Sequence, residues 1–136
     1  MKKLIFAAAL ILLAGVAYGQ HLQKGVILGV HNVTITLKPD VTMDQFLDAW
    51  KKNISEAEKM FDGWKGFLVK GNKGENVNEY GLVWYIESVE AYNKYYKKDE
   101  SETEEMVILR DKFQPELDEL ERWGTWTSKY TDWVIQ

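Results

Sequence analysis

Two segments of this 136-residue chain are apolar at both odd and even positions, which limits the folds that it can adopt. Residues 26–37 begin Val-Ile-Leu-Gly-Val, and residues 79–87 contain Leu-Val-Trp-Tyr-Ile. Both are rich in the β-branched and aromatic residues that favour strands. Successive side chains of a strand point to opposite faces of its sheet, so each segment requires cover on both faces.

The residues between these two strands predict an amphipathic helix followed by a third strand. Thr42-Met43-Asp44-Gln45 has the pattern of a capping box, and apolar residues then recur at spacings of three and four. These are Phe46, Trp50, Ile54, Ala57 and Phe61. We expect the helix to end at Gly63, and residues 64–70 to form a strand that pairs with residues 79–87 in a hairpin.

The second half of the chain predicts helical segments and a last strand. Ser88 is expected to cap a helix that runs through Tyr96, and the charged residues 97–105 are interpreted as a solvated loop. Ser101 begins another capping-box pattern, and Pro115 predicts a kink or a fresh start in the helix that follows. Residues 126–135 form the last strand.

The resulting element order predicts an α+β protein with a ferredoxin-like βαββαβ fold. Its four-stranded antiparallel sheet would carry helices on one face only. The other face is too apolar for contact with water, because the strands at residues 26–37 and 79–87 are apolar on both sides. We therefore expect a second copy of the chain to cover it, which gives a homodimeric α+β barrel.

The N-terminus has the pattern of a secretory signal peptide. Lys2 and Lys3 precede the apolar residues 4–16, and Ala17 and Gly19 occupy the small-residue positions of a cleavage site. Cleavage would leave residues 20–136 as one domain, periplasmic or secreted and no longer attached to a membrane. The alternative is an uncleaved N-terminal anchor.

Charge and composition restrict the partners of this domain. Removal of residues 1–19 removes two lysines and no acid, so the net charge changes from −4 to −6. This balance argues against nucleic acid and against anionic membrane surfaces, which both attract clustered Lys and Arg. The chain contains no cysteine and six tryptophans, so its stability must come from burial of large apolar side chains rather than from disulfides.

The sequence resembles the dimeric α+β barrel superfamily, particularly stress-responsive barrel and antibiotic-biosynthesis-monooxygenase-like proteins. The features that carry the resemblance are His31 in the first strand, Leu37-Lys38-Pro39, the cap at Thr42, Tyr80 to Ile86 leading into Glu87-Ser88-Val89-Glu90-Ala91-Tyr92, and Phe113-Gln114-Pro115-Glu116-Leu117. It covers most of residues 26–135 and implies the dimeric barrel architecture. Some relatives are cyclases that use a tyrosine and a histidine near the second helix. Tyr95 matches the tyrosine, but no histidine follows it here.

His31 is the candidate acid–base residue, and Tyr95 is its candidate partner. The imidazole titrates near neutral pH, so His31 could serve as a general base in a pocket facing the first helix. The alternative is a half-buried histidine whose hydrogen bonds are satisfied within the protein. The candidate ligand-binding residues are Asn32, Tyr80, Trp84, Tyr92, Trp126 and Tyr130. Their aromatic rings predict either a cleft for a planar ligand or plain core and dimer interface.

No cofactor or metal site is predicted. After signal cleavage the only histidines are His21 and His31, and there is no cysteine, so transition-metal and haem ligands are scarce. Two functional hypotheses remain. The first is an exported small-molecule-binding or accessory protein. The second is a cofactor-independent enzyme, monooxygenase- or cyclase-like, that acts on a small hydrophobic or aromatic substrate.

Overall fold

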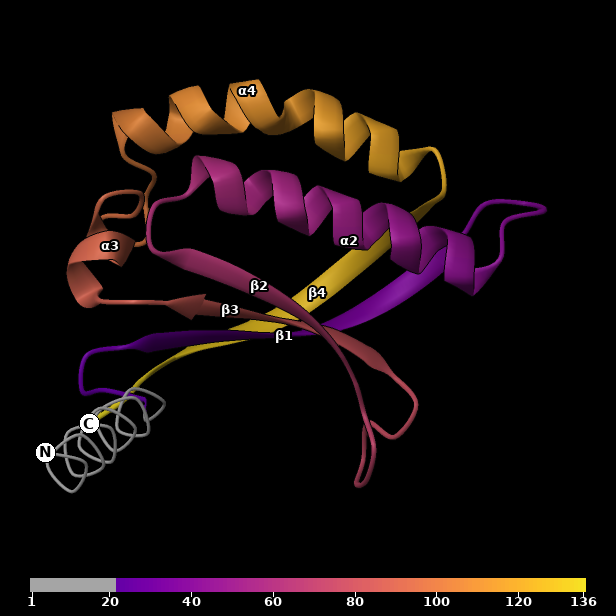
Figure 1. The fold of residues 1–136 in the computed structure, drawn as a ribbon, viewed down its shortest axis with the longest axis horizontal. Helices are drawn as coiled ribbons and strands as arrows, with labels where there is room; N and C mark the ends of the chain where they lie inside the picture. The colour runs from indigo at the N-terminus through magenta and orange to yellow at the C-terminus, as the bar shows by residue number, and fades with distance from the viewer. Residues whose placement is uncertain (1–21) are drawn as a thin grey trace, which may run out of the picture.

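The structure, a computed structural model, describes residues 22–136 as a layer of sheet and a layer of helices (Figure 1). Its elements are β1 (Ile27–Leu37), α2 (Met43–Met60), β2 (Trp64–Lys70), β3 (Tyr80–Ile86), α3 (Val89–Asn93), α4 (Glu104–Glu121) and β4 (Gly124–Val134). The signal peptide predicted at residues 1–19 lies outside the described residues.

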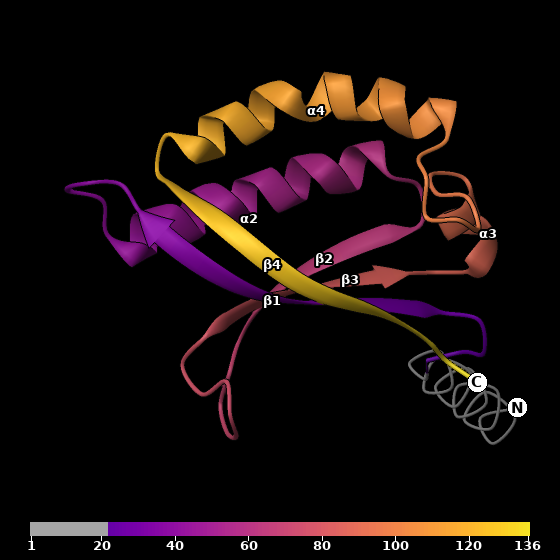
Figure 2. The same cartoon turned by 180° about the vertical axis from the view of Figure 1, so that it is seen from behind.

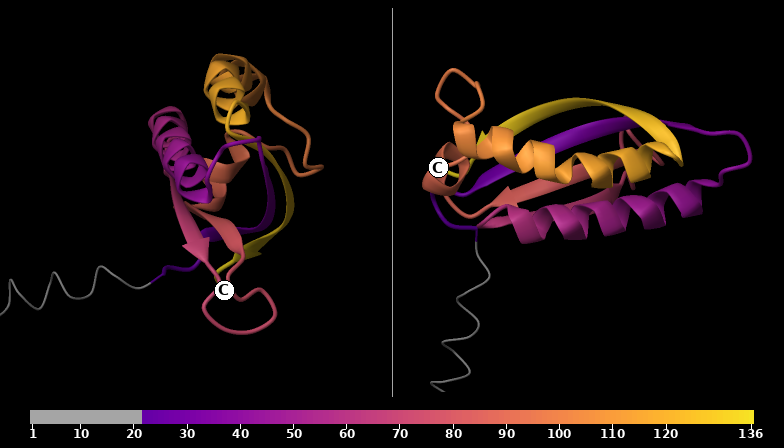
Figure 3. Two further views of the ribbon diagram at one scale, coloured as in Figure 1. Left: turned by 90° about the vertical axis from the view of Figure 1, so that its right-hand side faces the viewer. Right: turned by 90° about the horizontal axis from the view of Figure 1, so that it is seen from above.

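The four strands form one antiparallel sheet in the order β2-β3-β1-β4. The long strand β1 is central, with β3 paired on one side and β4 on the other. Helices α2 and α4 lie side by side across one face of this sheet (Figure 3). The predicted ferredoxin-like βαββαβ fold, with helices on one face, is therefore confirmed.

Helix α2 begins as the sequence predicts and ends earlier. The backbone N–H of Gln45 donates to Oγ1 of Thr42 at 3.3 Å, and the N–H of Thr42 donates to Oε1 of Gln45 at 2.9 Å, which completes the capping box. The helix stops at Met60 rather than at Gly63, which lies in the turn into β2 with a φ of 75°. A Cβ at Gly63 would lie 2.6 Å from the Glu87 side chain, so this turn requires glycine.

The prediction that Ser101 caps α4 is wrong, because Thr103 does so. The N–H of Met106 donates to Oγ1 of Thr103 at 3.2 Å, while both the hydroxyl and the N–H of Ser101 donate to Oδ1 of Asp99. Glu102 is extended and forms a bridge with Tyr96, so no helix can begin before residue 103.

Of the two outcomes predicted at Pro115, a kink or a fresh helix start, the fresh start is wrong, because α4 continues through this residue as one helix. Figure 1 shows α4 as an unbroken ribbon. Proline lacks an N–H and leaves the carbonyl of residue 111 without its helical donor. Both Pro115 and Asp111 lie on the exposed side of α4, where water can satisfy that carbonyl. The helix therefore keeps its packing against α2 across the proline.

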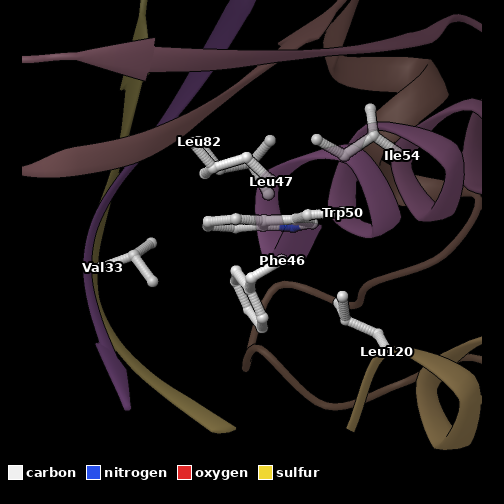
Figure 4. Packing of buried hydrophobic residues seen from close by; sticks show 7 residues of the cluster. All are labelled: Val33, Phe46, Leu47, Trp50, Ile54, Leu82 and Leu120. Atoms are coloured by element: carbon white, nitrogen blue, oxygen red, sulfur yellow. The ribbon is translucent and has the colours of Figure 1, made fainter. Parts of the chain in front are cut away.

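The main core lies between the sheet and the two long helices. Phe46 and Trp50 of α2 are almost fully buried and meet edge to face at 5.8 Å. The cluster consists of Val33, Phe46, Leu47, Trp50, Ile54, Leu82 and Leu120 (Figure 4). Its strand residues come from the C-terminal half of β1 and the N-terminal half of β3, so the other end of the sheet is left to a different group of side chains.

The second face of the sheet has no helix over it within residues 22–136 (Figure 2). The register sends to this open face the side chains of Leu28, Val30, Phe67, Val69, Val83, Tyr85 and Trp133. Phe67 and Trp133 are 52% and 61% exposed. The hairpin loop between β2 and β3 extends away from the helices beyond this face (Figure 1).

In the described part of the chain, no helix has both the length and the apolar character needed to cross a bilayer.

Candidate ligand-binding site

A cavity of about 240 Å³ lies on the helix-covered face of the sheet, below α3 and the loop that follows it. Gly29 of β1 forms its floor and is paired with Trp84 of β3 and Asp132 of β4. A Cβ at Gly29 would lie only 2.9 Å from Oδ1 of Asp132 and 3.5 Å from Cβ of Trp84. The missing side chain therefore creates the space between these two residues.

Aromatic rings form the walls of this aromatic pocket. The indole of Trp64 lies parallel to the ring of Tyr92 at 6.2 Å and meets Trp84 edge to face at 5.9 Å. Tyr96 lies 5.4 Å from Tyr92, and Tyr130 also lines the cavity. Such offset and edge-to-face arrangements stabilise an aromatic cluster beyond simple area burial, so these walls are held by one another.

Trp84 reaches this position because Gly66 of β2 leaves room for it. A Cβ at Gly66 would lie 2.8 Å from the Trp84 indole and 2.5 Å from Cγ2 of Ile54. The indole therefore rests over the backbone of the neighbouring strand. The two glycines, Gly29 and Gly66, lie on either side of Trp84 in the sheet and determine where its ring can lie.

The imidazole ring of His31 lines the pocket, and one of its two nitrogens already has a hydrogen-bond partner. Nδ1 lies 2.9 Å from Oγ of Ser128, whereas Nε2 has no hydrogen-bond partner among residues 22–136. Nε2 lies 3.8 Å from the Cβ position of Gly29, so it borders the cavity. The ring also stacks on Tyr130 at 5.1 Å. Burial lowers the pKa of His31 below its ordinary value, and the nearby charge of Asp132 opposes that shift, so the imidazole is neutral at pH 7.

Asp132 is the carboxylate of the pocket. Its Oδ2 accepts a hydrogen bond from the hydroxyl of Tyr92 at 3.1 Å, and it forms no ion pair with any residue of the described part of the chain. Burial and the charge of Asp132 raise the pKa of Tyr92, and burial raises that of Tyr96. Both tyrosines therefore remain neutral hydroxyl donors across the physiological range.

Four of the sequence-predicted site residues meet in this pocket. His31, Trp84, Tyr92 and Tyr130 come from three strands and α3, and they all line the same cavity. Strand parity indicated the shared face of the first, second and fourth of these residues. The position of α3 over the sheet end brings Tyr92 to them.

The structure places the other four elsewhere. Tyr95 is fully buried, and its hydroxyl accepts a hydrogen bond from the N–H of Asp62 at 2.9 Å. Tyr95 is therefore not available to a ligand. It is buried because α3 ends at Asn93, and the following turn directs Tyr95 inward and Tyr96 to the pocket. Tyr80 and Trp126 pack against the main core, and Asn32 is exposed on the open face.

Six lining residues were not among the predicted site residues: Gly29, Trp64, Ile86, Tyr96, Glu100 and Asp132. Asp132 has the same strand parity as Tyr130, so a carboxylate on the inward stripe was the available signal. Trp64 opens β2 and Tyr96 follows α3, and neither position has a periodic pattern that marks a pocket. Glu100 belongs to the charged loop that was interpreted as solvated, and it lies at the rim of the cavity.

Comparison with known proteins supports the fold. No protein-family model matches the sequence, and no curated protein matches it by sequence. SnoaB, described as a cofactor-independent oxygenase from Streptomyces nogalater, aligns with a TM-score of 0.50 and 12% identity over 82% of this chain and 94% of its own. A dimeric protein of unknown function and ferredoxin-like fold from Bacteroides fragilis aligns with a TM-score of 0.46 and 13% identity, over 85% of this chain and 100% of its own.

The chain thus shares with SnoaB the arrangement of one antiparallel sheet with helices on one face. At 12% identity the likeness to SnoaB concerns the arrangement of the chain and not its chemistry. Among residues 22–136, no three His, Asp or Glu side chains gather closely enough to hold a metal ion.

Replacement of Asp132 by Asn is expected to lower the pKa of His31 further, because the charge of Asp132 is what favours the imidazolium. Because the pKa of His31 is lower in the folded protein than in the unfolded chain, the folded protein binds fewer protons below about pH 6.5. Stability is therefore expected to fall as the pH drops from about 6.5 through the folded pKa, and to fall more in Asp132→Asn. NMR titration of the His31 ring and urea unfolding at several pH values measure both effects, with Asp118→Asn as a surface control. A His31 pKa above the ordinary value would contradict this assignment.

Proposed function

We propose that this protein is an exported small-molecule-binding or accessory protein whose ligand occupies the aromatic pocket. The observation that carries this proposal is a cavity lined by Gly29, by aromatic rings and by the two polar groups of His31 and Asp132. Ligand pockets are mostly apolar with a few placed polar anchors, and this arrangement has that composition.

The size and chemistry of the cavity support a small ligand. About 240 Å³ corresponds to the volume of roughly eight water molecules, so a compact ligand fits and a large one does not. The indole rings favour a flat or rounded apolar body. Nε2 of His31 and Oδ1 of Asp132 are available to hydrogen-bond one polar end of it. Export through residues 1–19 is part of the same proposal, and it would present this pocket to extracellular or periplasmic molecules.

Filling the cavity is expected to abolish binding. In Gly29→Val the new side chain enters the pocket floor and displaces the Asp132 carboxylate, whose Oδ1 would otherwise lie 2.9 Å from the new Cβ. Valine suits the extended backbone of β1. The neutral planar probe 2-naphthol, followed by NMR, should bind the wild-type protein and lose at least about tenfold in affinity for Gly29→Val. Two controls, Thr36→Val on the open side of β1 and Tyr95→Phe in the core, should retain binding. Equal binding by Gly29→Val would place the ligand elsewhere.

A second candidate is a cofactor-independent enzyme, and the free Nε2 of His31 favours it. A neutral imidazole that borders an aromatic cavity is suited to accept a proton from a bound hydroxyl group. The hydrogen bond between Nδ1 and Ser128 would hold the ring while it does so. The fold shared with SnoaB, described as a cofactor-independent oxygenase, is compatible with such a reaction.

Oxygen uptake with 1,4-dihydroxynaphthalene tests this enzyme candidate. The diol would lose two electrons and two protons to O₂ to give the quinone and hydrogen peroxide, with His31 as the first proton acceptor. Uptake above the protein-free rate should fall by about a hundredfold in His31→Ala and persist in Tyr95→Phe, since general-base catalysis contributes on that order. Uptake equal to the protein-free rate would exclude this reaction and leave the binding role.

We also propose that the open face pairs with the open face of a second copy. Within one chain it leaves Phe67 and Trp133 more than half exposed, beside the apolar side chains of Leu28 and Val30. Two faces with the same pleat and twist pack in an aligned manner, and an isologous pair satisfies both at once. A homodimer of this kind leaves the aromatic pocket on the opposite side of each sheet.

Trp133→Glu is expected to convert the dimer into a folded monomer. Trp133 is 61% exposed in the lone chain, so its replacement removes interface and not core. Light scattering should give twice the chain mass for the wild type and a single chain mass for the variant, with unchanged circular dichroism. Ile108→Glu, 55% exposed on α4, is the matched control and should remain dimeric. A wild-type monomer at micromolar concentration would contradict the proposal.

A further inference from the structure

The charged side chains that line the aromatic pocket are all acidic. Asp132 and Glu100 are the ionisable acids of its lining, and among the described residues no Lys or Arg lines it. His31 is neutral at pH 7, so it does not offset them. The cavity therefore has a negative electrostatic potential that an incoming anion would meet unfavourably.

The one arginine near this region is already compensated. Arg110 of α4 affects Tyr96, but its guanidinium forms an ion pair with Glu102. Lys94, on the far side of α3, is paired with Asp62 and Glu105. Neither cation is free to neutralise Asp132, whose only described hydrogen-bond donor is the hydroxyl of Tyr92.

The aromatic rings add to the same electrostatic preference. The face of an indole or phenol ring is its negative side, and it attracts a cation within about 6 Å of the centroid. Trp64, Trp84, Tyr92, Tyr96 and Tyr130 all line one small cavity. Five aromatic rings and a carboxylate thus line one volume, and this combination suits a positively charged ligand that carries an apolar body.

We infer that the aromatic pocket recognises an organic cation, with an alkylated ammonium group held among the rings and against the carboxylate of Asp132. This inference rests on the proposed small-molecule-binding function and names its ligand class. An alkylated ammonium has a diffuse charge and few or no N–H groups, so it loses little hydration on entry and requires no hydrogen-bond acceptors from the walls. The negative charge of Asp132 offsets the cost of burying the positive charge of the ligand.

The same arrangement disfavours two other ligand classes. A phenolate or carboxylate would lie beside Asp132 with no cation to balance it. A bare metal ion would require several oxygen or nitrogen ligands. Residues 22–136 contain no cluster of three or more His, Asp or Glu side chains that could hold one. A neutral planar molecule fits the walls but gains nothing from the carboxylate.

Choline and its neutral isostere 3,3-dimethyl-1-butanol provide the test, because they differ in charge and hardly in shape. In NMR titrations the methyl signal of choline should shift upfield on binding, owing to ring currents from the walls. Choline is expected to bind at least about tenfold more tightly than the isostere. Asp132→Asn should remove most of that preference, while Asp118→Asn, an exposed carboxylate on α4, should leave it unchanged.

Tyr130 separates cation–π attraction from simple charge. It is 59% exposed on the edge strand β4, so its replacement leaves the core intact. Tyr130→Leu should weaken choline binding and spare the isostere, whereas Tyr130→Phe, which keeps the ring, should bind choline as the wild type does.

The outcomes also distinguish this inference from the function on which it rests. If 2-naphthol and the isostere bind as well as choline, or if choline does not bind at about 10 mM while 2-naphthol does, the cation inference is overturned and the binding function stands. If neither choline nor 2-naphthol binds, both fail together. Choline binding that persists in Gly29→Val would also overturn the inference, because the cation would then lie outside the pocket.

Discussion

The packing of α2 against the sheet determines where the rest of the molecule can lie. Phe46 and Trp50 fill the space over the C-terminal half of β1, and α4 closes this core through Leu120. At the N-terminal half of β1, the helical and loop residues that line the aromatic pocket belong to α3 and the loop that follows it, and none of the lining residues comes from α2 or α4. The main core and the aromatic pocket are thus two ends of one face, divided by the reach of α2.

In the aromatic pocket, burial and the charge of Asp132 both act on the pKa values of His31 and of the tyrosines. Burial disfavours the protonated form of His31, whereas the neighbouring carboxylate favours it, and burial has the larger effect. The tyrosines respond to both influences in the same sense, because burial and the carboxylate each oppose their ionisation. The pocket consequently has one fixed negative charge on β4, a second from Glu100 in the loop after α3, and otherwise neutral hydrogen-bonding groups. This arrangement favours some ligand charges and disfavours others without any conformational change.

Local patterns predicted the strands, the first helix and the sharing of faces, because each depends on a period that residues carry by themselves. Thr42 and Gln45 form their capping box from adjacent backbone alone. The start of α4 depends instead on the bridge between Tyr96 and Glu102, a pairing that a capping pattern at Ser101 does not reveal. Tyr95 was predicted as a site residue because it matches the tyrosine of the cyclase relatives. The chain instead leaves helical geometry at Asn93, which turns Tyr95 inward and brings Tyr96 to the pocket. The cavity itself depends on the absence of a side chain at Gly29 between two long ones on neighbouring strands.

Strand β1 contributes to both sides of the protein in strict alternation. Gly29 and His31 face the cavity, and Leu28 and Val30 face the opposite surface. Since the side-chain period of a strand is two, an insertion or deletion of one residue would exchange the two sets, sending aliphatic chains into the cavity and the imidazole outward. This segment can therefore diverge only by replacement at fixed length. Odd positions can adapt to a new ligand and even positions to a new neighbour, each independently of the other.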